Sequence, residues 1–434
     1  MKLLIFSDDW GRHPSSCQHL IRQLLPEHQV TWVNTIGMRP PRLDMITIRR
    51  GLEKLRGWKR EVASGERREA SDEKEENDQV LEPASSATSE NSPLATSNLQ
   101  PPSHRSPPAQ PAVIDAKMWP WMSHRWDRWL NRRLLTKQLR EAAEDAVVIT
   151  TIPIVADLVD SLPAKRWVYY CVDDFSVWPG LDGEMLGRME DELVAKVDCT
   201  IAVSDTLMDS LRRRGCSPHL LTHGVDLDFW RTGQSRELLD ASGKEKEKDQ
   251  EREPAASDHS PLASRNSPLI LFWGVLDRRM NADWVLGLAD SLDGGEVRLV
   301  GPHQDPDPRL LHHDRIRTPG AVPFDELPRL ASTADVLIMP YADLPVTRAM
   351  QPLKLKEYLA TGKPVVVSPL PATTEWRDCL HVVDDQASFI ARVKTILNSI
   401  DRTDGEAART QVALTRLDQE SWSAKAAMML GWIG

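Results

Sequence analysis

Three charged side chains gather around a segment that has the pattern of a loop followed by a short helix. Arg348 and Lys354 would place positive charge at the start of this helix, where it could neutralise a phosphate. Glu357 would lie about one and a half turns into the helix, where its carboxylate could accept a hydrogen bond from a sugar hydroxyl. The alternative is that Lys354 and Glu357 simply form a solvated helix face, and the spacing alone does not decide between the two.

The residues that open this helix favour anion binding. Pro352 is expected near the first helical position, where its missing N–H costs nothing, and Gly362 is expected just after the helix end. The free amides of the opening residues would therefore form an anion site that the helix dipole supports. These opening residues are Met350, Gln351, Pro352 and Leu353.

Residues 352–366 resemble the nucleotide-sugar signature of the group 1 (family 4-like) glycosyltransferases, which have the GT-B fold. The resemblance is closest to the bacterial branch that includes teichuronic acid and exopolysaccharide glycosyltransferases. It implies that Glu357 binds the donor ribose, that the helix N-terminus holds the diphosphate, and that the reaction retains anomeric configuration without a metal. Many members carry a second Glu eight residues earlier, which contacts the transferred sugar, and here that position is Ala349.

Further segments are similar to the same family. Gly274, after the apolar run 269–273, resembles the opening of the donor domain, where a basic pair neutralises the pyrophosphate. Arg278 and Arg279 are the candidates for that pair, and the alternative is that they are ordinary surface arginines. Shorter matches occur at 202–207, 222–226, 299–302 and 320–328, with His223 where relatives usually have Asn.

Two acids in the first half follow an apolar run and are expected at the C-terminal end of a strand. Asp173 or Asp174 could act there as a base toward an acceptor hydroxyl. The alternative is that one carboxylate caps the following turn.

The loop after the first expected strand is a second candidate for acceptor binding. Gly11, Arg12 and Ser15 could contact an acceptor, and His13 could lie near the reaction centre. Ser15 could instead be the N-cap of the following helix, and His13 an ordinary exposed loop histidine.

Short apolar runs alternate with helical patterns along both halves of the chain, which predicts parallel strands covered by helices on both faces. The first half is expected to contain strands 3–7, 30–34, 147–150, 167–172, 200–203 and 220–222, and helices 15–25, 126–143, 184–197 and 205–214. The second half is expected to contain strands 269–273, 297–300, 336–339, 365–368 and 381–383, and helices 282–292, 324–331, 352–360 and 386–400. The fold class is therefore α/β, with two Rossmann-like domains facing each other across a cleft that holds the ligands.

Two tryptophan-rich segments need separate interpretation. Residues 118–135 combine four Trp with several Arg, which could mark contact with an anionic membrane. The preferred interpretation is a helix that packs on the sheet through Trp126, Trp129, Leu130 and Leu134. The closing segment 421–432 is expected to form a helix that returns to the first domain and packs through Trp422, Met428, Met429 and Trp432.

Composition and charge limit which partners and which cellular compartment these domains are expected to have. The chain has 434 residues with 54 Lys and Arg against 64 Asp and Glu, and a net charge of −10 argues against a nucleic-acid partner. Much of this charge lies in two polar stretches, 60–115 and 234–268, which are expected to be disordered inserts. The expected domains are therefore 1–233 on the acceptor side, 269–410 for the nucleotide sugar, and 411–434 as the returning helix. No apolar run is long enough to span a membrane, and five scattered Cys without a Cys-x-x-Cys favour a reducing cytoplasm.

Together these features predict a cytoplasmic glycosyltransferase, with peripheral membrane contact left open. It would use a nucleotide-diphosphate sugar as co-substrate, no cofactor and no metal, and a glycan or lipid-linked acceptor. A nucleotide-sugar epimerase of the same fold is one alternative, since Asp173, Asp174 and His13 could supply acid and base groups. A non-catalytic nucleotide-sugar-binding protein is the other, because Ala349 replaces the usual Glu.

Overall fold

The computed structural model describes residues 1–12, 15–34, 109–231, 267–399 and 404–434. The predicted inserts lie largely outside the described residues, except for the end of the first. There the prediction is wrong, because residues 112–115 form a strand, β3 (Ala112–Asp115), that pairs in parallel with β2. The strand contains a short apolar run, Ala112–Ile114, inside a stretch rich in polar residues and Pro, and it lies at the sheet edge with Val113 exposed.

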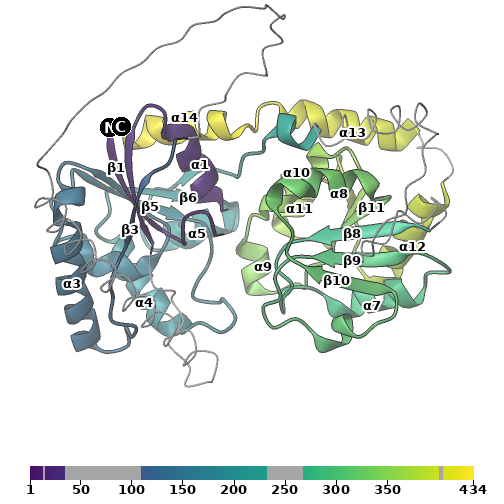
Figure 1. The fold of residues 1–434 in the computed structure, drawn as a ribbon, viewed down its shortest axis with the longest axis horizontal. Coiled ribbons are helices and arrows are strands. Elements are labelled where there is room, and N and C mark those ends of the chain that lie inside the picture. The colour runs from purple at the N-terminus through teal and green to yellow at the C-terminus, as the bar shows by residue number, and fades with distance from the viewer. Residues whose placement is uncertain (13–14, 35–108, 232–266, 400–403) are drawn as a thin grey trace, which may run out of the picture. The chain divides into compact units, whose positions relative to one another are not determined.

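The first parallel sheet has seven strands in the order β3-β2-β1-β4-β5-β6-β7 (Figure 1). Its other strands are β1 (Lys2–Ser7), β2 (Gln29–Asn34), β4 (Val147–Thr150), β5 (Arg166–Cys171), β6 (Cys199–Ala202) and β7 (His219–Leu220). The connecting helices are α1 (Ser16–Leu24), α3 (Arg125–Ala143), η1 (Pro153–Leu158), α4 (Gly183–Val194) and α5 (Asp205–Arg213). Separate apolar clusters cover the two faces of this sheet, as the continuous apolar runs predict.

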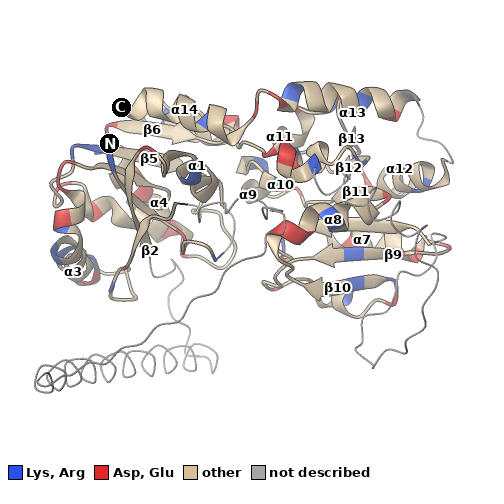
Figure 2. Cartoon of the chain, turned by 45° about the horizontal axis from the view of Figure 1, so that its top comes forward, with Lys and Arg blue, Asp and Glu red and all other residues tan. Residues whose placement is uncertain are grey.

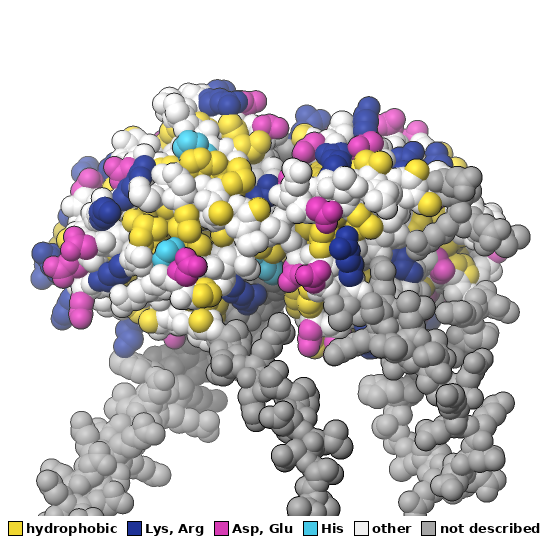
Figure 3. Space-filling model, turned by 90° about the horizontal axis from the view of Figure 1, so that it is seen from above, with side chains coloured by type: hydrophobic (Ala, Val, Ile, Leu, Met, Phe, Trp, Pro, Cys, Tyr) yellow, Lys and Arg dark blue, Asp and Glu magenta, His cyan; other side chains and the backbone are white. Residues whose placement is uncertain are grey.

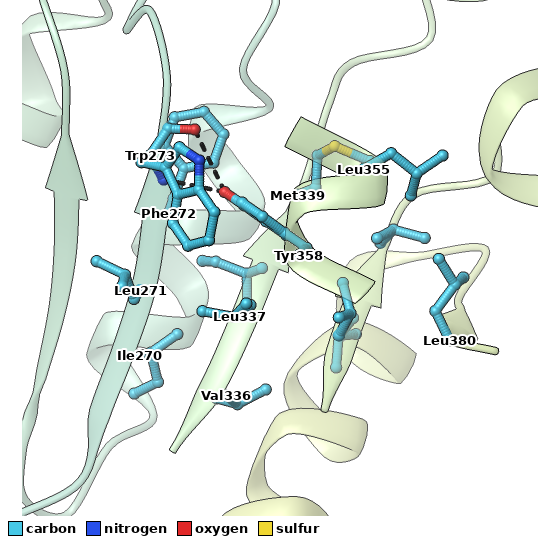
Figure 4. Packing of buried hydrophobic residues seen from close by; sticks show 14 of the residues in the cluster. Ile270, Leu271, Phe272, Trp273, Val336, Leu337, Met339, Leu355, Tyr358 and Leu380 are labelled. Atoms are coloured by element: carbon cyan, nitrogen blue, oxygen red, sulfur yellow. Dashed lines mark hydrogen bonds between the residues drawn. The ribbon is translucent and has the colours of Figure 1, made fainter. Parts of the chain in front are cut away.

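The second parallel sheet has six strands in the order β10-β9-β8-β11-β12-β13. They are β8 (Leu269–Trp273), β9 (Glu296–Val300), β10 (Ile316–Gly320), β11 (Val336–Met339), β12 (Val365–Val367) and β13 (His381–Val382). The helical elements are α7 (Ala282–Asp290), η2 (Pro308–Leu311), η3 (Phe324–Glu326), α8 (Leu327–Thr333), α9 (Pro345–Ala349), α10 (Leu353–Ala360), α11 (Pro371–Thr374), α12 (Gln386–Asn398), α13 (Asp404–Leu417) and α14 (Trp422–Ile433). Figure 4 shows the core between β8, β11 and α10.

The expected helix 324–331 is divided into η3 and α8. Pro328 has no N–H, so the α-helical bond to the carbonyl of Phe324 cannot form and a tighter turn takes its place. Among the described residues, no helix has both the length and the apolar character that crossing a bilayer requires.

The predicted packing of α3 is wrong. Trp126 and Trp129 are 53% and 52% exposed, and Leu134 is also exposed. The buried face carries Asp127, Asn131, Leu135, Leu139 and Ala143. Hydrogen bonds explain this orientation of the helix. Asp127 accepts bonds from the Trp119 indole and the His124 amide, and Asn131 bonds to the Trp119 backbone. Asp127 and Asn131 therefore face inward.

The closing helix α14 packs beside α1 and joins the apolar cluster of the first sheet (Figure 1). Trp422 and Met429 are buried as predicted, and the ring of Trp432 stacks on His219 at 4.6 Å between centroids. Met428 does not pack there, because it is 44% exposed.

A buried ion cluster ties the end of the first half to the second half. Lys356 of α10 lies 2.5 Å from the Glu420 carboxylate and 3.2 Å from the Thr222 hydroxyl. Lys425 of α14 contacts the same carboxylate at 2.5 Å. One acidic group therefore compensates two buried ammonium groups from different elements.

Candidate functional site

The first part of the site lies where β8 ends. Gly274 follows Trp273 with φ 140°, and a Cβ there would lie 1.9 Å from the Lys354 ammonium nitrogen. Lys354 donates to the Tyr341 hydroxyl at 2.6 Å and lies 4.4 Å from the centroid of the Phe272 ring. A side chain at position 274 would displace this ammonium group, so the structure brings the predicted residues Gly274 and Lys354 together.

Glu357 lies next to this cation and is not on a solvated helix face. Its carboxylate accepts a hydrogen bond of 3.1 Å from the Trp273 indole N–H. Burial raises the pKa of Glu357 to about 7, although the Trp273 bond and the Lys354 charge oppose that shift. The indole is itself held by stacking on Trp230 and by a contact of 4.1 Å between ring centroids with Tyr358, whose hydroxyl bonds to the Trp273 backbone (Figure 4).

The start of α10 differs in detail from the prediction. Pro352 is the N-cap and Leu353 is the first helical residue, because Pro352 has extended backbone angles. The Met350 amide is not free, since it donates to the Val346 carbonyl at the end of α9. The Leu353 amide opens the helix and has no partner within it. The side-chain nitrogen of Gln351 is buried and has no hydrogen-bond partner in the described part of the chain.

Arg278 and Arg279 are in different environments. Arg279 is largely buried, forms an ion pair of 2.7 Å with Asp277, and lies 4.7 Å from the centroid of the Trp178 ring. Arg278 is exposed and pairs with Asp305 at 2.6 Å on the surface. The structure therefore brings Arg279, but not Arg278, to residues of the first half.

Arg348 and Ala349 end the short helix α9. Arg348 pairs with Asp343 at 2.5 Å, and both side chains are about 60% exposed, so its charge is compensated at the surface. Ala349 is buried, and its carbonyl accepts a hydrogen bond from the Ser204 hydroxyl. The position where many relatives carry a Glu is thus a packing contact with the first half.

The two acids after β5 have separate roles in the structure. Asp174 accepts a hydrogen bond of 3.0 Å from the Ser176 amide and caps the turn, which was the alternative interpretation. Among the described residues, the Asp173 carboxylate makes no such turn-capping hydrogen bond. Burial raises the pKa of Asp173 to about 7, while the nearby positive charge of Arg279 opposes the shift.

The loop after β1 is organised by a residue that sequence reasoning missed. The Asp8 carboxylate accepts hydrogen bonds from the hydroxyls of Ser7 and Ser15 and from the side-chain amide of Gln18. Ser15 also caps α1 through the Gln18 backbone amide, as its alternative interpretation predicts. Burial raises the pKa of the Asp8 carboxyl.

The other residues predicted in this loop are exposed or undescribed. Gly11 has φ 76° and donates its amide to the side chain of Gln18. Arg12 pairs with Asp9 at 3.1 Å on the surface. His13 lies outside the described residues.

Comparison with known proteins decides what the second half is. Residues 267–399 match the family described as "Glycosyl transferases group 1". These residues form a group 1 glycosyltransferase domain. The resemblance of residues 352–366 to this family is thereby confirmed, since the match includes the Gly274, Lys354 and Glu357 positions.

A curated relative points in the same direction. The chain is 28% identical over 174 residues to TuaH of Bacillus subtilis, a protein named for teichuronic acid biosynthesis as a glycosyltransferase. This alignment includes 37% of the chain and spans 43% of the length of that relative.

Solved structures extend the likeness of the fold beyond the group 1 domain. Anabaena Alr3699/HepE, in complex with UDP and glucose, has a TM-score of 0.60 at 12% identity and covers 99% of this chain and 98% of its own. Sucrose-phosphate synthase from Thermosynechococcus elongatus has a TM-score of 0.62 at 14% identity, with 98% and 96% covered. The chain therefore has the GT-B fold that was predicted.

Sequence reasoning missed several residues that surround the group 1 domain's site. Trp273 and Tyr341 stand at the ends of adjacent strands, β8 and β11, and strand-end position was a signal that could have found them. Asp277 and Trp178 become visible only through their contacts with Arg279, because the sequence assigned no role to either residue.

Proposed function

We propose that this protein transfers a sugar from a nucleotide-diphosphate sugar to a glycan or lipid-linked acceptor. The observation that carries the proposal is the Glu357 carboxylate, held by the Trp273 indole beside the Lys354 ammonium group. A carboxylate beside a cation and a helix N-terminus suits a ligand that presents hydroxyls at one end and phosphates at the other.

The donor contacts divide by chemistry. Glu357 accepts hydrogen bonds from the ribose hydroxyls. The Leu353 amide and the unpartnered Gln351 side-chain nitrogen donate to the diphosphate, and Lys354 neutralises its charge. This arrangement stabilises the leaving nucleotide with groups that are already oriented before reaction.

The acceptor side depends on Asp173. With a pKa near 7 it can accept a proton from an acceptor hydroxyl at neutral pH, which is the range where a general base is most effective. Arg279 lies near this carboxyl and adds positive charge on the donor side. As in the family that the donor segment resembles, the reaction retains anomeric configuration and proceeds without a metal. The bond between the sugar and the diphosphate therefore breaks ahead of attack, the acceptor oxygen bonds to the sugar from the face that the diphosphate leaves, and Asp173 takes the hydroxyl proton.

The likeness to HepE bound to UDP and glucose supports a uridine nucleotide as the first donor to test. The match to TuaH supports an acceptor that belongs to a cell-surface polysaccharide.

Titration calorimetry with UDP, UDP-glucose, UDP-N-acetylglucosamine, GDP-mannose and ADP-glucose tests the donor site. We expect one nucleotide class to bind, and Glu357→Gln to weaken that binding about 10- to 100-fold, because it removes a charge-assisted hydrogen bond. Glu326→Gln changes an exposed acid of the same domain and serves as the matched control. Equal affinities of the Glu357→Gln and Glu326→Gln proteins would exclude this donor site.

Product analysis with the donor alone separates transfer from epimerisation. A transferase leaves the donor sugar's configuration unchanged and releases nucleotide slowly by hydrolysis. Conversion into a second nucleotide sugar would instead identify an epimerase. Binding without any turnover, when candidate acceptors are also supplied, would identify a non-catalytic binding protein.

A further inference from the structure

The outward face of α3 has an unusual composition. It carries Trp126 and Trp129, which are 53% and 52% exposed, and Trp121 in the preceding segment is 40% exposed. At 100° per residue, these helix positions lie opposite the buried stripe of Asp127, Asn131, Leu135 and Leu139. The indoles therefore project from the domain and do not belong to its core.

Basic side chains share this face. Arg133, Lys137 and Arg140 are exposed and lie on the same side of the helix as the two tryptophans, with Arg125 at its edge. The Arg133 guanidinium lies 5.9 Å from the centroid of the Trp129 ring. Figure 2 shows basic residues along α3.

The acids of α3 do not offset this charge. Asp127 is buried as part of the cap, and Glu141 lies near the C-terminal end. Arg128 is paired with Asp157 and Glu192 on the flank of the helix. The outward face thus combines exposed indoles with net positive charge.

A different face of the molecule provides the contrast. In Figure 3 hydrophobic side chains are interspersed with both basic and acidic ones. Isolated exposed apolar residues of this kind are ordinary on soluble proteins. The α3 face differs because its exposed groups are large indoles with charges of one sign.

We propose that the outward face of α3 binds the surface of an anionic lipid bilayer. Indole rings prefer the boundary between headgroups and acyl chains, and Arg and Lys are attracted by anionic headgroups. Charge complementarity and the indoles together favour a lipid surface over an acidic polypeptide, which would satisfy the basic residues but not the three rings.

Co-sedimentation of the full chain with lipid vesicles tests this proposal without measuring sugar transfer, so its outcome is independent of the proposed function. The vesicles contain phosphatidylcholine alone or with 30% phosphatidylglycerol. We expect binding to the anionic vesicles, weaker binding to the neutral ones, and a loss of binding as salt screens the charges.

Two variants identify the face. Arg133→Glu with Lys137→Glu should weaken vesicle binding about tenfold or more, because each basic residue near an anionic surface strengthens binding several-fold. Trp126→Ala with Trp129→Ala should also weaken binding, and it should reduce the quenching of tryptophan fluorescence by lipids brominated in the acyl chain.

The controls change equivalent groups elsewhere. Arg329→Glu with Arg392→Glu alters two exposed basic residues of the second half, and Val412→Ala with Met428→Ala alters exposed apolar ones. Circular dichroism melting checks that each variant is folded. The proposal is overturned if the full chain ignores anionic vesicles, if the α3 variants bind as well as the controls, or if the α3 face instead mediates dimerisation in sedimentation experiments.

Discussion

At the residue scale, the decisive feature is a carboxyl group that titrates near neutral pH. Glu357 is half-buried beside β8, and its hydrogen bond from Trp273 and the Lys354 charge only partly offset the effect of burial on its pKa. Its charge therefore changes in the pH range where an enzyme works. Two consequences can be measured.

Donor binding should depend on pH. Binding of the ribose hydroxyls needs the ionised carboxylate, and Glu357 is half-protonated at about pH 7. Affinity for a nucleotide sugar should therefore rise with pH up to about 8 and fall up to about tenfold per unit below pH 7. Calorimetry from pH 6 to 9 measures this, and Glu357→Gln should bind weakly at all pH values.

Trp273→Phe should move this pH profile. The substitution keeps an aromatic ring but removes the N–H that bonds to Glu357. Because that bond lowers the pKa of Glu357, its loss raises the pKa, and the profile should move to higher pH. A profile that stays in place would show that the indole does not tune the carboxyl.

Asp173 and Asp174 should separate in kinetic assays. Asp173→Asn should lower the turnover number about 10²- to 10⁴-fold with little change in donor affinity, because it removes the proposed base. Asp174→Asn is the matched control, since its amide oxygen can still accept from the Ser176 amide. Equal turnover by both variants would rule out Asp173 as the base.

At the element scale, the site depends on how closely a strand end and a helix approach each other. Gly274 directly follows β8, and Gly301 directly follows β9. The two backbones lie so close that a Cβ on Gly301 would be 1.9 Å from the Gly274 carbonyl oxygen. At position 274 itself, any side chain would have to displace the Lys354 ammonium group of α10 and adopt a positive φ.

Gly274→Ala tests this approach. The added methyl would meet the Lys354 ammonium and would occupy a backbone conformation that costs about 1–3 kcal/mol for a residue with a side chain. We expect a lower melting temperature and weaker donor binding. Adding Lys354→Met should restore part of the stability but not the binding. If the double variant binds the donor normally, Lys354 is not a donor contact.

At the scale of the whole molecule, the cluster of Lys356, Lys425 and Glu420 joins elements from both halves. Lys356 is 2% and Lys425 8% exposed, so their charges are poorly solvated and depend on one carboxylate. Burial lowers the pKa of Lys356 to about 8. His223 beside them is buried, and burial lowers its pKa to about 3, so it adds no charge at neutral pH.

The three charges predict an asymmetry between substitutions. Glu420→Gln removes the carboxylate that two buried ammonium groups share and should lower the free energy of unfolding by about 3 kcal/mol or more. Lys356→Met should have a smaller effect, because Glu420 keeps Lys425 as its partner. Urea unfolding followed by tryptophan fluorescence measures both. If Lys356→Met lowered the free energy of unfolding more than Glu420→Gln, Lys356 would contribute more to stability than Glu420.

Local patterns in the sequence predict the two parallel sheets and the helix bounded by Pro352 and Gly362, because apolar runs and helix-boundary residues act over a few positions. The GT-B fold and the donor segment were implied by the resemblance of residues 352–366 to a known family. Which charged residues meet depends on the tertiary structure. It brings Lys354 to Gly274 and Glu357 to Trp273, and it leaves Arg278 and Arg348 in surface ion pairs. It also reversed the expected orientation of α3, since helical periodicity does not reveal that polar caps are buried and tryptophans exposed. The physical reason is the same in each case. Periodicity and turn residues act over a few positions, whereas ion pairs, burial and the resulting pKa values depend on residues far apart in the chain.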